Sequence, residues 1–327
     1  MNPGRPRVFV TRKLVGDGVE RLARELDVEV WPEPDPPPRD VLIAEAAKSQ
    51  GLLTTLTDRI DAELLDAAPG LRMVANLAVG YDNIDVGAAT ARRVLITNTP
   101  GVLTETVADL TFALILSFAR RMPEGDRAVR DGTWGVWSPH FLLGRDVHGT
   151  TIGIVGLGAI GLAVARRALG FGMKVIYYNR TRKAQAESEL GLEYASLEEL
   201  LRRSDWVSVS IALNEETRNL LGSAEFRMMK PDGVIVNTAR GGVIDQAALV
   251  EALRERRIGG AALDVFAVEP IPTDDPLLAL DNVIVMPHLG SASVQTRTAM
   301  TDLCVDNLLA VFRGDGPLTP VNPEVLA

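Results

Sequence analysis

Short hydrophobic runs recur along the chain and alternate with longer segments in which apolar residues return every three or four positions. Within the first hundred residues the short runs are predicted strands and the periodic segments are predicted helices. The strands are expected at 7–11, 28–31, 51–54, 73–76 and 94–97, and the helices at 15–26, 39–48, 61–67 and 86–92. Regular alternation of strand and helix indicates a parallel sheet covered by helices on both faces.

The same alternation returns after residue 150 and predicts a second parallel sheet. Its strands are expected at 151–155, 174–178, 206–211, 234–237, 260–264 and 283–286, with helices near 197–202, 223–228 and 246–255. A long helix from about 104 to 120 is apolar nearly all round, so we expect it to be buried between domains or between subunits. Residues 123–150 are less regular, and we expect this excursion to cover a partner subunit rather than to form a surface loop with its own small core.

A last predicted helix, 291–312, is placed to carry the chain back to the first domain. The predicted fold class is therefore α/β, with two doubly wound parallel-sheet domains. Residues 1–98 and 291–327 would form a flavodoxin-like substrate domain, and residues 99–290 a Rossmann dinucleotide-binding domain. The chain would cross near 98–105 and 287–295, and the cleft between the domains, beyond the carboxyl ends of the strands, is the expected active site.

Three glycines between the predicted strand 151–155 and the helix after it have the G-x-G-x-x-G spacing. In this pattern Gly156 makes the tight turn, Gly158 lets backbone approach a pyrophosphate, and Gly161 lets the helix pack on the strand. The spacing alone also fits a βα turn with no ligand, but here it lies inside a complete strand–helix–strand unit. The sequence therefore predicts a dinucleotide cofactor.

The end of the next strand bears on the choice of cofactor. An NAD site carries Asp or Glu there, to bind the ribose 2′-hydroxyl. This chain has Asn179 and Arg180, so no carboxylate would repel a 2′-phosphate and a guanidinium could pair with it. We expect NADP(H) to be preferred, with NAD(H) possible; the alternative is that these bases form only a solvated loop.

Composition excludes several classes of partner. The chain has 327 residues with 34 Lys and Arg against 43 Asp and Glu, a formal charge of −9, which disfavours nucleic acid and anionic membranes. No apolar stretch is long enough for a membrane span, and the N-terminus lacks a signal-peptide core. The one cysteine, Cys304, cannot form an intrachain disulfide and fits a cytoplasmic protein. Three scattered histidines predict no metal site.

Three residues that each follow a predicted strand are the candidates for catalysis. Arg240 could hold a carboxylate through two hydrogen bonds. His288, if held by Glu269, would be stabilised as an imidazolium that donates a proton near neutral pH. Spacing alone cannot bring Glu269 beside His288, and a lone histidine or a surface arginine is often only structural. With a dinucleotide, these groups suggest hydride reduction of a ketone beside a carboxylate, with His288 as the acid and Arg240 polarising the carbonyl.

Six motifs in order give the chain a resemblance to a known family. They are Asn76-Leu-Ala-Val-Gly-Tyr-Asp-Asn-Ile-Asp85, Thr99-Pro-Gly-Val-Leu-Thr-Glu-Thr-Val-Ala-Asp109, Gly156-Leu-Gly-Ala-Ile-Gly161, Asn237-Thr-Ala-Arg-Gly-Gly242, Asp264-Val-Phe-Ala-Val-Glu-Pro270 and Pro287-His-Leu-Gly-Ser291. Over essentially its full length the chain resembles the D-isomer-specific 2-hydroxyacid dehydrogenases, and most of all their glyoxylate/hydroxypyruvate reductases.

The resemblance implies a small anionic 2-keto acid substrate and assigns a role to each matching residue. Arg240, Glu269 and His288 would be the catalytic set. The substrate would be bound by the backbone at Val79 and Gly80, by Arg240 and His288, and near Ser291. The implied cofactor contacts are Thr106, Gly156, Leu157, Gly158, Ala159, Ile160, Asn179, Arg180, Thr181, Leu213, Thr238, Ala239, Asp264 and Gly290, with Asp264 on the nicotinamide carboxamide.

The family is usually dimeric, which implies a homodimer with helix 104–120 in its interface. An aromatic residue of the partner, Trp137 or Phe141, would then shape the substrate pocket. Other family substrates remain open: a bulkier 2-keto acid, phosphoglycerate, phosphite or formate. Phosphoglycerate is less favoured because the chain stops at Ala327 without a further C-terminal domain. A dinucleotide-sensing protein like the corepressors that share this fold is a weaker alternative, because all three catalytic residues are present.

Overall fold

The computed structural model describes residues 4–327. These residues form two compact units, each with its own parallel sheet. Unit 1 extends to Leu103 and resumes with Ser291–Ala327, and unit 2 is Thr104–Gly290. The chain leaves unit 1 once and returns to it once, so unit 1 is built from two separate parts of the sequence.

The first boundary lies later in the chain than residue 98, where the hydrophobic pattern places it. The side-chain amide of Asn98 donates a hydrogen bond to the Val79 carbonyl at 2.8 Å. The Thr99 N–H donates to the Ala78 carbonyl at 2.9 Å. Backbone groups must find partners when they leave water, and these partners lie in unit 1, so the segment after 98 belongs to it as far as Leu103.

Unit 1 contains a five-stranded sheet in the order β2-β1-β3-β4-β5, the flavodoxin-like order. Its strands are β1 (Arg7–Val10), β2 (Asp27–Val30), β3 (Gly51–Thr54), β4 (Met73–Asn76) and β5 (Leu95–Thr97). Its helices are α1 (Gly18–Glu25), α2 (Arg39–Ala46), α3 (Ala62–Ala67), α4 (Val86–Ala91), α12 (Val294–Arg313) and the short η3 (Pro323–Leu326). Its paired strands are all parallel, as the alternation predicts.

The returning segment completes unit 1. Helix α12 packs against α1 and β4, and a Cβ on Gly51 would lie only 3.0 Å from the ring of Phe312, which shows how closely this helix lies on the sheet. The Asn322 side chain accepts a hydrogen bond from the Ile96 N–H at 2.7 Å and donates to the Val94 carbonyl at 3.0 Å. The C-terminal segment therefore supplies part of the core and part of the hydrogen bonding at strand β5.

Unit 2 contains a seven-stranded parallel sheet in the order β12-β11-β10-β9-β6-β7-β8. Its strands are β6 (Thr151–Val155), β7 (Lys174–Tyr178), β8 (Glu193–Tyr194), β9 (Trp206–Val209), β10 (Val234–Asn237), β11 (Gly260–Leu263) and β12 (Val283–Val285). Its helices are α5 (Thr104–Ala119), α6 (Met122–Arg130), α7 (Ala159–Gly170), α8 (Ala184–Leu190), α9 (Leu197–Arg203), α10 (Ser223–Met228), α11 (Gln246–Arg254), η1 (Gly241–Val243) and η2 (Pro276–Ala279).

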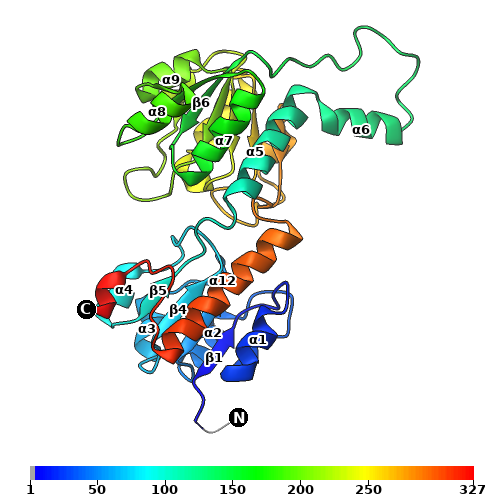
Figure 1. Ribbon diagram of the computed structural model, residues 1–327. Helices are drawn as coiled ribbons and strands as arrows, with labels where there is room; N and C mark the ends of the chain where they lie inside the picture. Colours follow the sequence, from blue (N-terminus) through cyan, green and yellow to red (C-terminus); the bar gives the residue numbers. More distant parts are fainter. Residues whose placement is uncertain (1–3) are drawn as a thin grey trace. The chain divides into compact units, whose positions relative to one another are not determined.

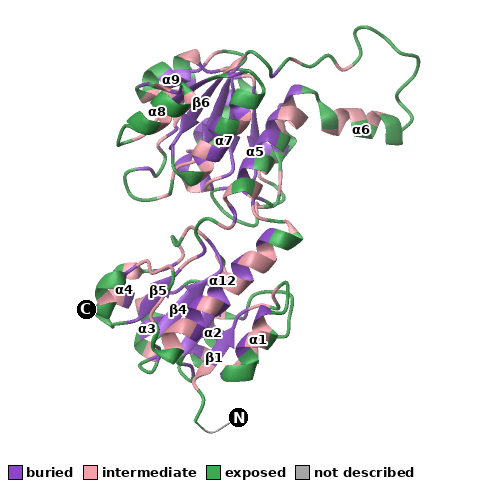
Figure 2. Cartoon of the chain, viewed as in Figure 1, coloured by how far each residue is buried: buried purple, intermediate pink, exposed green. Residues whose placement is uncertain are grey.

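Counted from β6, this is the Rossmann strand order with one further strand, β12, at the edge. The order reverses between β6 and β9, and doubly wound sheets bind their ligands outside the carboxyl ends of the strands at such a point. Figure 2 shows the central strands of both sheets in the buried colour. This burial explains why they are continuous apolar runs rather than alternating ones.

Besides the short 3₁₀ helices η1, η2 and η3, three elements were not predicted from the sequence. The interpretation of 123–150 as irregular was wrong at its start, because residues 122–130 form helix α6. Helix α8 and the two-residue strand β8 were also missed. Neither α6 nor α8 has a buried residue.

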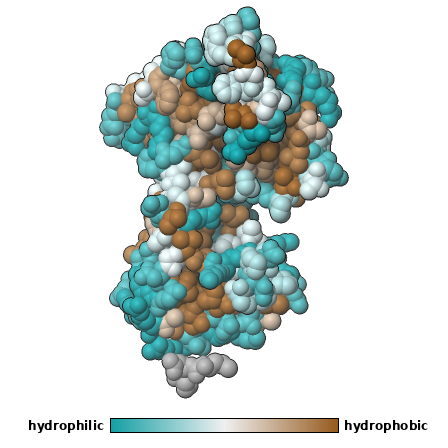
Figure 3. Space-filling view, turned by 90° about the vertical axis from the view of Figure 1, so that its right-hand side faces the viewer, coloured by the Kyte–Doolittle hydropathy of each residue, from teal (hydrophilic) through white to brown (hydrophobic). Residues whose placement is uncertain are grey.

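Helix α5 leaves part of its apolar surface uncovered within this chain. It packs on α7, β10 and β11, yet Ala113 is exposed and Leu110 and Leu116 are half-buried. Figure 1 shows α6 and the loop after it extending away from the sheet of unit 2. Hydrophobic surface is exposed on the face drawn in Figure 3. In the loop after α6, Trp137 and Phe141 are 77% and 44% exposed. Among the described residues, no helix has the length and apolar character needed to cross a membrane.

Candidate active site

The turn between β6 and α7 has room only for glycine at two of its three motif positions. Gly156 has φ +98°, and a Cβ there would lie 2.7 Å from the Ser210 carbonyl oxygen. A Cβ at Gly161 would lie 2.2 Å from the carbonyl oxygen of Gly156. At Gly158, by contrast, a Cβ would meet no atom within 4 Å. Two glycines therefore shape the turn, and the third leaves the backbone open to an approaching ligand.

The start of helix α7 fits a dinucleotide. Gly158 caps the helix with extended backbone and offers no side-chain hydrogen bond, and no acidic residue lies in the first turn. Gly158 and Ala159 are exposed, Ile160 is half-buried, and Leu157 is buried in the core. The first N–H groups of a helix have no partner inside it and attract anions. The residues present at this turn therefore suit a pyrophosphate.

The loop after β7 presents Arg180 to solvent. The Asn179 side chain folds back and donates to the Thr181 carbonyl at 2.7 Å. Arg180 is 85% exposed and pairs with Glu216 at 3.3 Å, a residue that is itself 74% exposed. Such an exposed pair contributes little to stability, so a stronger anion could displace Glu216.

Two neighbours fix the shape of this loop. Arg182 forms a forked ion pair with Glu187, with N···O distances of 2.6 and 2.8 Å. The Tyr177 hydroxyl donates to Glu187 at 2.7 Å and accepts from the Lys183 N–H at 2.7 Å. The hydrogen bond from Arg182, followed by that from Tyr177, lowers the pKa of Glu187 to about 2. Arg182 therefore holds the loop in shape through Glu187, whereas Arg180 points into solvent.

The turn after β10 is organised by an asparagine. The Asn237 side chain accepts from the Ala239 N–H and donates to the Arg240 carbonyl, both at 3.0 Å. The hydroxyl of Thr238 lies 2.9 Å from that of Thr111 on α5, which donates to its own helix. These contacts hold Arg240, which is half-buried, at the carboxyl end of the strand.

The sequence could not place Glu269 beside His288, but the structure does. Glu269 Oε2 and His288 Nδ1 are 2.7 Å apart, and the two side chains are 29% and 25% exposed. The other carboxylate oxygen of Glu269 accepts from the Phe266 N–H at 2.9 Å. This leaves Nε2 as the ring nitrogen of His288 that can act on a substrate.

The charge state of Glu269 follows from its neighbours. Burial acts to raise its pKa, but the hydrogen bonds from His288 and the Phe266 N–H and the charges of His288 and Arg240 outweigh burial and lower it. Glu269 is therefore ionised at neutral pH and can accept the Nδ1 proton of His288. The influence of Arg240 also means that the three predicted catalytic residues lie in one electrostatic environment.

Asp264 follows β11 and is fully buried. Its two carboxylate oxygens accept hydrogen bonds from the Leu289 N–H at 2.7 Å and the Gly290 N–H at 2.8 Å. Burial raises its pKa, and the Leu289 N–H, the charge of His288 and the Gly290 N–H act against that rise. Asp264 is thus joined to the backbone directly after His288.

The remaining predicted cofactor residues of unit 2 lie on its helices and loops. Thr106 is a half-buried residue in the first turn of α5. Leu213 is half-buried, and its side chain lies 3.1 Å from where a Cβ on Gly242 would be. Both contacts with a cofactor stay predictions. No group of three or more His, Cys, Asp or Glu that could hold a metal ion occurs within residues 4–327.

The predicted substrate residues Val79, Gly80 and Ser291 belong to unit 1. The Val79 carbonyl accepts from the Asn98 side chain, and the Gly80 carbonyl accepts from Asn76 at 3.1 Å. Because the N–H and C=O of a planar peptide point in opposite directions, these bonds fix where the N–H groups of the loop point. The role of these residues in substrate binding stays a prediction.

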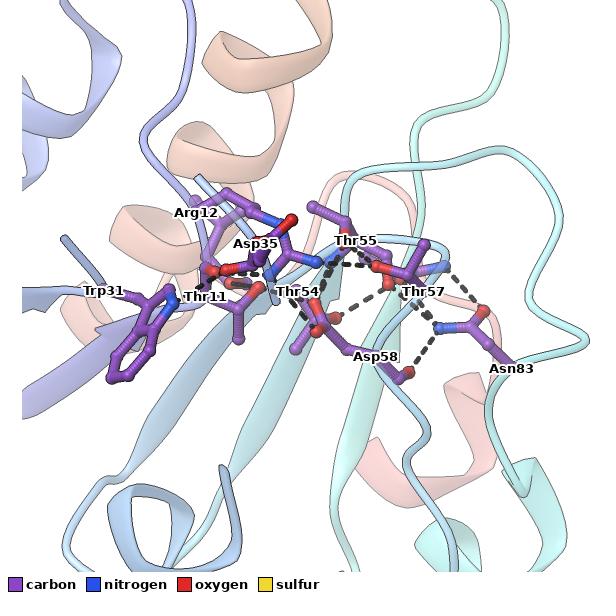
Figure 4. Close-up of polar contacts among 11 residues, drawn as sticks. Thr11, Arg12, Trp31, Asp35, Thr54, Thr55, Thr57, Asp58 and Asn83 are labelled. Carbon is purple, nitrogen blue, oxygen red and sulfur yellow. Dashed lines mark hydrogen bonds and ion pairs between the residues drawn. The ribbon is translucent and has the colours of Figure 1, made fainter. Parts of the chain in front are cut away.

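A polar network lies at the carboxyl ends of β1 and β3 in unit 1 (Figure 4). Asp58, only 2% exposed, accepts from the Thr11 hydroxyl at 2.5 Å and the Thr55 N–H at 2.7 Å. Arg12 donates to the Thr57 hydroxyl at 2.8 Å. The Asn83 side chain donates to two carbonyls of the loop 55–58. We call these residues the Asp58 network. The carboxylate of Asp58 holds together the loops of unit 1.

Sequence reasoning missed Thr111, Tyr177 and Glu187 as supports of the candidate site. Thr111 is the only hydroxyl residue on the buried face of α5, and a polar residue in an otherwise apolar stripe is a usable signal because buried hydroxyls need partners. Tyr177 and Glu187 gave no such signal, because a tyrosine in a strand and a glutamate in a helix are both ordinary.

A sheet in Rossmann order, a glycine-rich turn at its switch point and a carboxylate-held histidine are together typical of dinucleotide-dependent dehydrogenases. Residues 112–290 match the family model described as D-isomer specific 2-hydroxyacid dehydrogenase, NAD binding domain. The chain belongs to the D-isomer specific 2-hydroxyacid dehydrogenase family and is an oxidoreductase. This confirms the resemblance seen in the sequence.

Relatives named glyoxylate reductase match nearly the whole chain. The glyoxylate reductase of Korarchaeum cryptofilum is 51% identical over 323 residues, which cover 98% of this chain and 97% of that protein. The glyoxylate reductase of Thermococcus kodakarensis is 49% identical over 326 residues, covering 98% of both chains.

Solved structures agree with the fold. A protein of Thermus thermophilus is 47% identical, with a TM-score of 0.91 and coverage of 96% of this chain and 99% of that chain. The NADPH-dependent glyoxylate/hydroxypyruvate reductase of Sinorhizobium meliloti, solved in complex with NADP and malonate, is 37% identical with a TM-score of 0.86 and covers 97% of both chains. The predicted fold class is confirmed.

Proposed function

We propose that this protein reduces small 2-keto acids, glyoxylate and hydroxypyruvate, to the corresponding 2-hydroxy acids, with the D configuration where the product is chiral. The observation that carries the proposal is the 2.7 Å contact between His288 Nδ1 and Glu269 Oε2 at the carboxyl edge of a Rossmann sheet. Relatives named glyoxylate reductase, about half identical to this chain, support the choice of substrate.

His288 is the acid in this proposal. A bound nicotinamide dinucleotide would supply the hydride. The imidazolium donates a proton from Nε2 to the carbonyl oxygen of the substrate, while ionised Glu269 holds Nδ1 and stabilises the charged ring. Because negative charge grows on that oxygen in the transition state, a prepositioned cation stabilises the transition state more than the ground state.

Arg240 binds the carboxylate of the substrate. Its planar guanidinium can form two parallel hydrogen bonds to a carboxylate, which orients the neighbouring keto group as well as attracting it. The Asn237 side chain supports this role by bonding the backbone on both sides of the turn that carries Arg240. We further propose that the N–H groups at Val79 and Gly80 bind the same carboxylate and that Ser291 lies near the substrate.

NADPH is the proposed cofactor in preference to NADH. No carboxylate ends β7, and Arg180 is exposed and held only by a weak surface pair with Glu216. A 2′-phosphate carries more charge than one carboxylate and would replace Glu216 as the partner of Arg180. The Sinorhizobium meliloti relative was solved with NADP.

A homodimer is the proposed assembly. The outward face of α5, the helix α6 and the loop after it expose apolar side chains that the chain itself does not cover, among them Val129, Val136 and Trp137. Exposed apolar patches of this kind mark interaction sites. A second copy would bury them, and either Trp137 or Phe141 would reach the partner's pocket.

The proposal is tested by initial rates with glyoxylate and with hydroxypyruvate, each with NADPH and with NADH. Rapid turnover with NADPH on either substrate is the expected result. Turnover with NADH alone would keep the reaction and refute the cofactor preference. Binding of NADPH without turnover of any 2-keto acid would refute the enzymatic proposal and favour a dinucleotide sensor.

A further inference from the structure

The segment that follows α12 in unit 1 is hydrogen-bonded to the loop that carries Val79. The Thr319 hydroxyl donates to the backbone carbonyl of Asn98 at 2.7 Å, and the Asn98 side-chain amide donates to the Val79 carbonyl at 2.8 Å. The Asn98 N–H also donates to the Thr319 carbonyl, at 3.4 Å. Asn98 therefore joins the segment after α12 to the predicted substrate loop.

A buried asparagine on α12 fixes the direction of the Thr319 hydroxyl. Asn307 has no exposed surface, and its side-chain oxygen accepts from the Leu318 and Thr319 N–H groups at 2.9 and 3.0 Å. Its amide nitrogen lies 2.9 Å from the Thr319 hydroxyl oxygen. An amide nitrogen only donates, so the single proton of the Thr319 hydroxyl is left for the Asn98 carbonyl.

The bond from Asn98 to Val79 sets the direction of the next backbone N–H. The Val79 carbonyl and the Gly80 N–H belong to one planar peptide group and point in opposite directions. Gly80 is half-buried, and no backbone carbonyl among residues 4–327 accepts its N–H. A series of hydrogen bonds that begins on α12 thus ends at one of the two N–H groups proposed to bind the substrate carboxylate.

We propose that Thr319 is a positioning residue for substrate binding, which acts through Asn98 to hold the Val79–Gly80 peptide with its N–H toward the carboxylate of the 2-keto acid. A backbone donor binds a carboxylate well only when it is held in the productive direction. The segment after α12 therefore serves substrate binding as well as the core of unit 1. The inference rests on the proposed role of the Gly80 N–H.

The test is Thr319→Val, which keeps the size of the side chain but cannot donate to Asn98. We expect the KM of glyoxylate to rise by about tenfold, because a hydrogen bond to a charged group is weakened. This bond is made equally in the ground state and the transition state, so kcat and the Kd of NADPH should stay near wild type. In the free protein, the NMR resonances of the Gly80 amide and the Asn98 side-chain amide should shift. Thr319→Ser keeps the hydroxyl and should restore the wild-type KM.

Asn322→Ala is the matched control. Asn322 also fastens the segment after α12 to β5, through the Ile96 N–H at 2.7 Å and the Val94 carbonyl at 3.0 Å, but it does not bond Asn98. Asn322→Ala should lower the thermal midpoint and leave the KM and both resonances unchanged. An equal rise in KM in Asn322→Ala and Thr319→Val would overturn the inference, because Thr319 would then only fasten the segment. A wild-type KM in Thr319→Val would overturn it too.

Failure of the proposed function would give a different result. A wild-type protein inactive on every 2-keto acid would refute that function, while the two resonances of the free protein would still decide whether Thr319 holds the Val79–Gly80 peptide, since unshifted resonances in Thr319→Val would overturn the inference. Thr319→Cys, a weaker donor of similar size, replaces Thr319→Val if valine prevents folding. Its KM should then lie between those of wild type and a tenfold rise, and a wild-type value would count against the inference.

Discussion

The two sheets of this protein end in loops of very different character. Both are parallel and doubly wound, and both carry buried carboxylates just beyond the carboxyl ends of their strands. In unit 1, Asp58 is bonded to Thr11 and Thr55, residues of the loops around it. In unit 2, Asp264 and Glu269 are bonded to a half-buried histidine and the backbone after it.

The difference between the two units separates the groups that hold a loop in shape from the groups that can carry out chemistry. A buried carboxylate braces loops in both units, because its lone pairs satisfy N–H and O–H groups that would otherwise lack partners. Unit 2 adds two features that the Asp58 network lacks: open backbone at Gly158 and a titratable ring with one nitrogen left for chemistry. Function therefore comes from these additions, and the fold alone does not confer it.

The largest effect on turnover is expected when the imidazole ring of His288 is removed. His288→Ala should lower kcat by about 10²–10⁴-fold, the usual contribution of general acid catalysis, while the Kd of NADPH stays near wild type. Steady-state rates and fluorescence titration measure the two. His148→Ala, at an exposed position in the loop after α6, is the control. A near-normal rate in His288→Ala would remove this residue from the mechanism.

The Asp58 network should affect stability and not cofactor binding. Asp58→Asn should reduce the free energy of unfolding of unit 1 by about 1–3 kcal/mol, since buried donors lose their acceptor. Hydrogen exchange of the β1 and β3 amides reports this unit separately. Asp35 is an exposed neighbour labelled in Figure 4. Asp35→Asn should therefore change the free energy of unfolding of unit 1 very little. A shift in the Kd of NADPH for Asp58→Asn would contradict the comparison between the units.

The open backbone of the glycine turn is tested at Gly158. Gly158→Ala introduces a Cβ into empty space, so the thermal midpoint should hold while the Kd of NADPH rises by about tenfold, or roughly 1.4 kcal/mol. Gly170→Ala makes the same change at the other end of α7, also in open space, and should leave the Kd unaltered. Equal Kd values in the two variants would show that the turn does not approach the cofactor.

A smaller effect is expected at the loop that sets cofactor preference. Arg180→Ala should raise the KM of NADPH by about fivefold, which corresponds to an exposed ion pair of up to about 1 kcal/mol, and should spare NADH. Lys183→Ala removes the same charge from the same loop and should affect neither cofactor selectively. Equal losses with NADPH and NADH in Arg180→Ala would refute the phosphate contact.

The smallest expected effect is on the stability of unit 2 at low pH, through Glu187 beside the loop after β7. Glu187 has its pKa lowered from 4.5 to about 2, so its contribution to stability is present above pH 4.5 and is lost as the pH falls from 4.5 toward 2. Glu187→Gln should therefore flatten the acid-side decline of unit 2 stability slightly, and carbon NMR of the carboxyl group gives its pKa. Glu189→Gln on the same helix should keep the wild-type slope. A wild-type slope in Glu187→Gln would show that Arg182 and Tyr177 do not stabilise this carboxylate.

Much of the fold could be predicted because its signal is local. The central strands of both sheets, such as β3, β4 and β10, are buried on two faces, so each is an apolar run that is visible in the sequence. Helix α6 could not be predicted in the same way. It has no buried residue and carries Pro123 and Gly125, and nothing within unit 2 requires an apolar stripe on it.

The candidate site was predictable in its residues but not in its geometry. Strand-end positions single out Arg240, Glu269 and His288 because ligands bind at that edge of a parallel sheet. The pairing of Glu269 with His288 depends on how two separate loops fold, which no spacing encodes. The bonds from the segment 288–290 to Asp264 were invisible for a further reason: they use backbone N–H groups, which every sequence shares, and a left-handed residue that is not glycine.

The discontinuity of unit 1 has a consequence for synthesis. All the strands of unit 2 lie between Thr104 and Gly290, so its sheet can form on the ribosome before the segment that follows has been translated. Unit 1 begins first but cannot finish, because α12 and Asn322, which bonds β5, emerge only afterwards. Unit 2 can therefore complete its fold before unit 1 does, and for that interval the sheet of unit 1, not yet covered by α12, is the part of the nascent chain most in need of a chaperone.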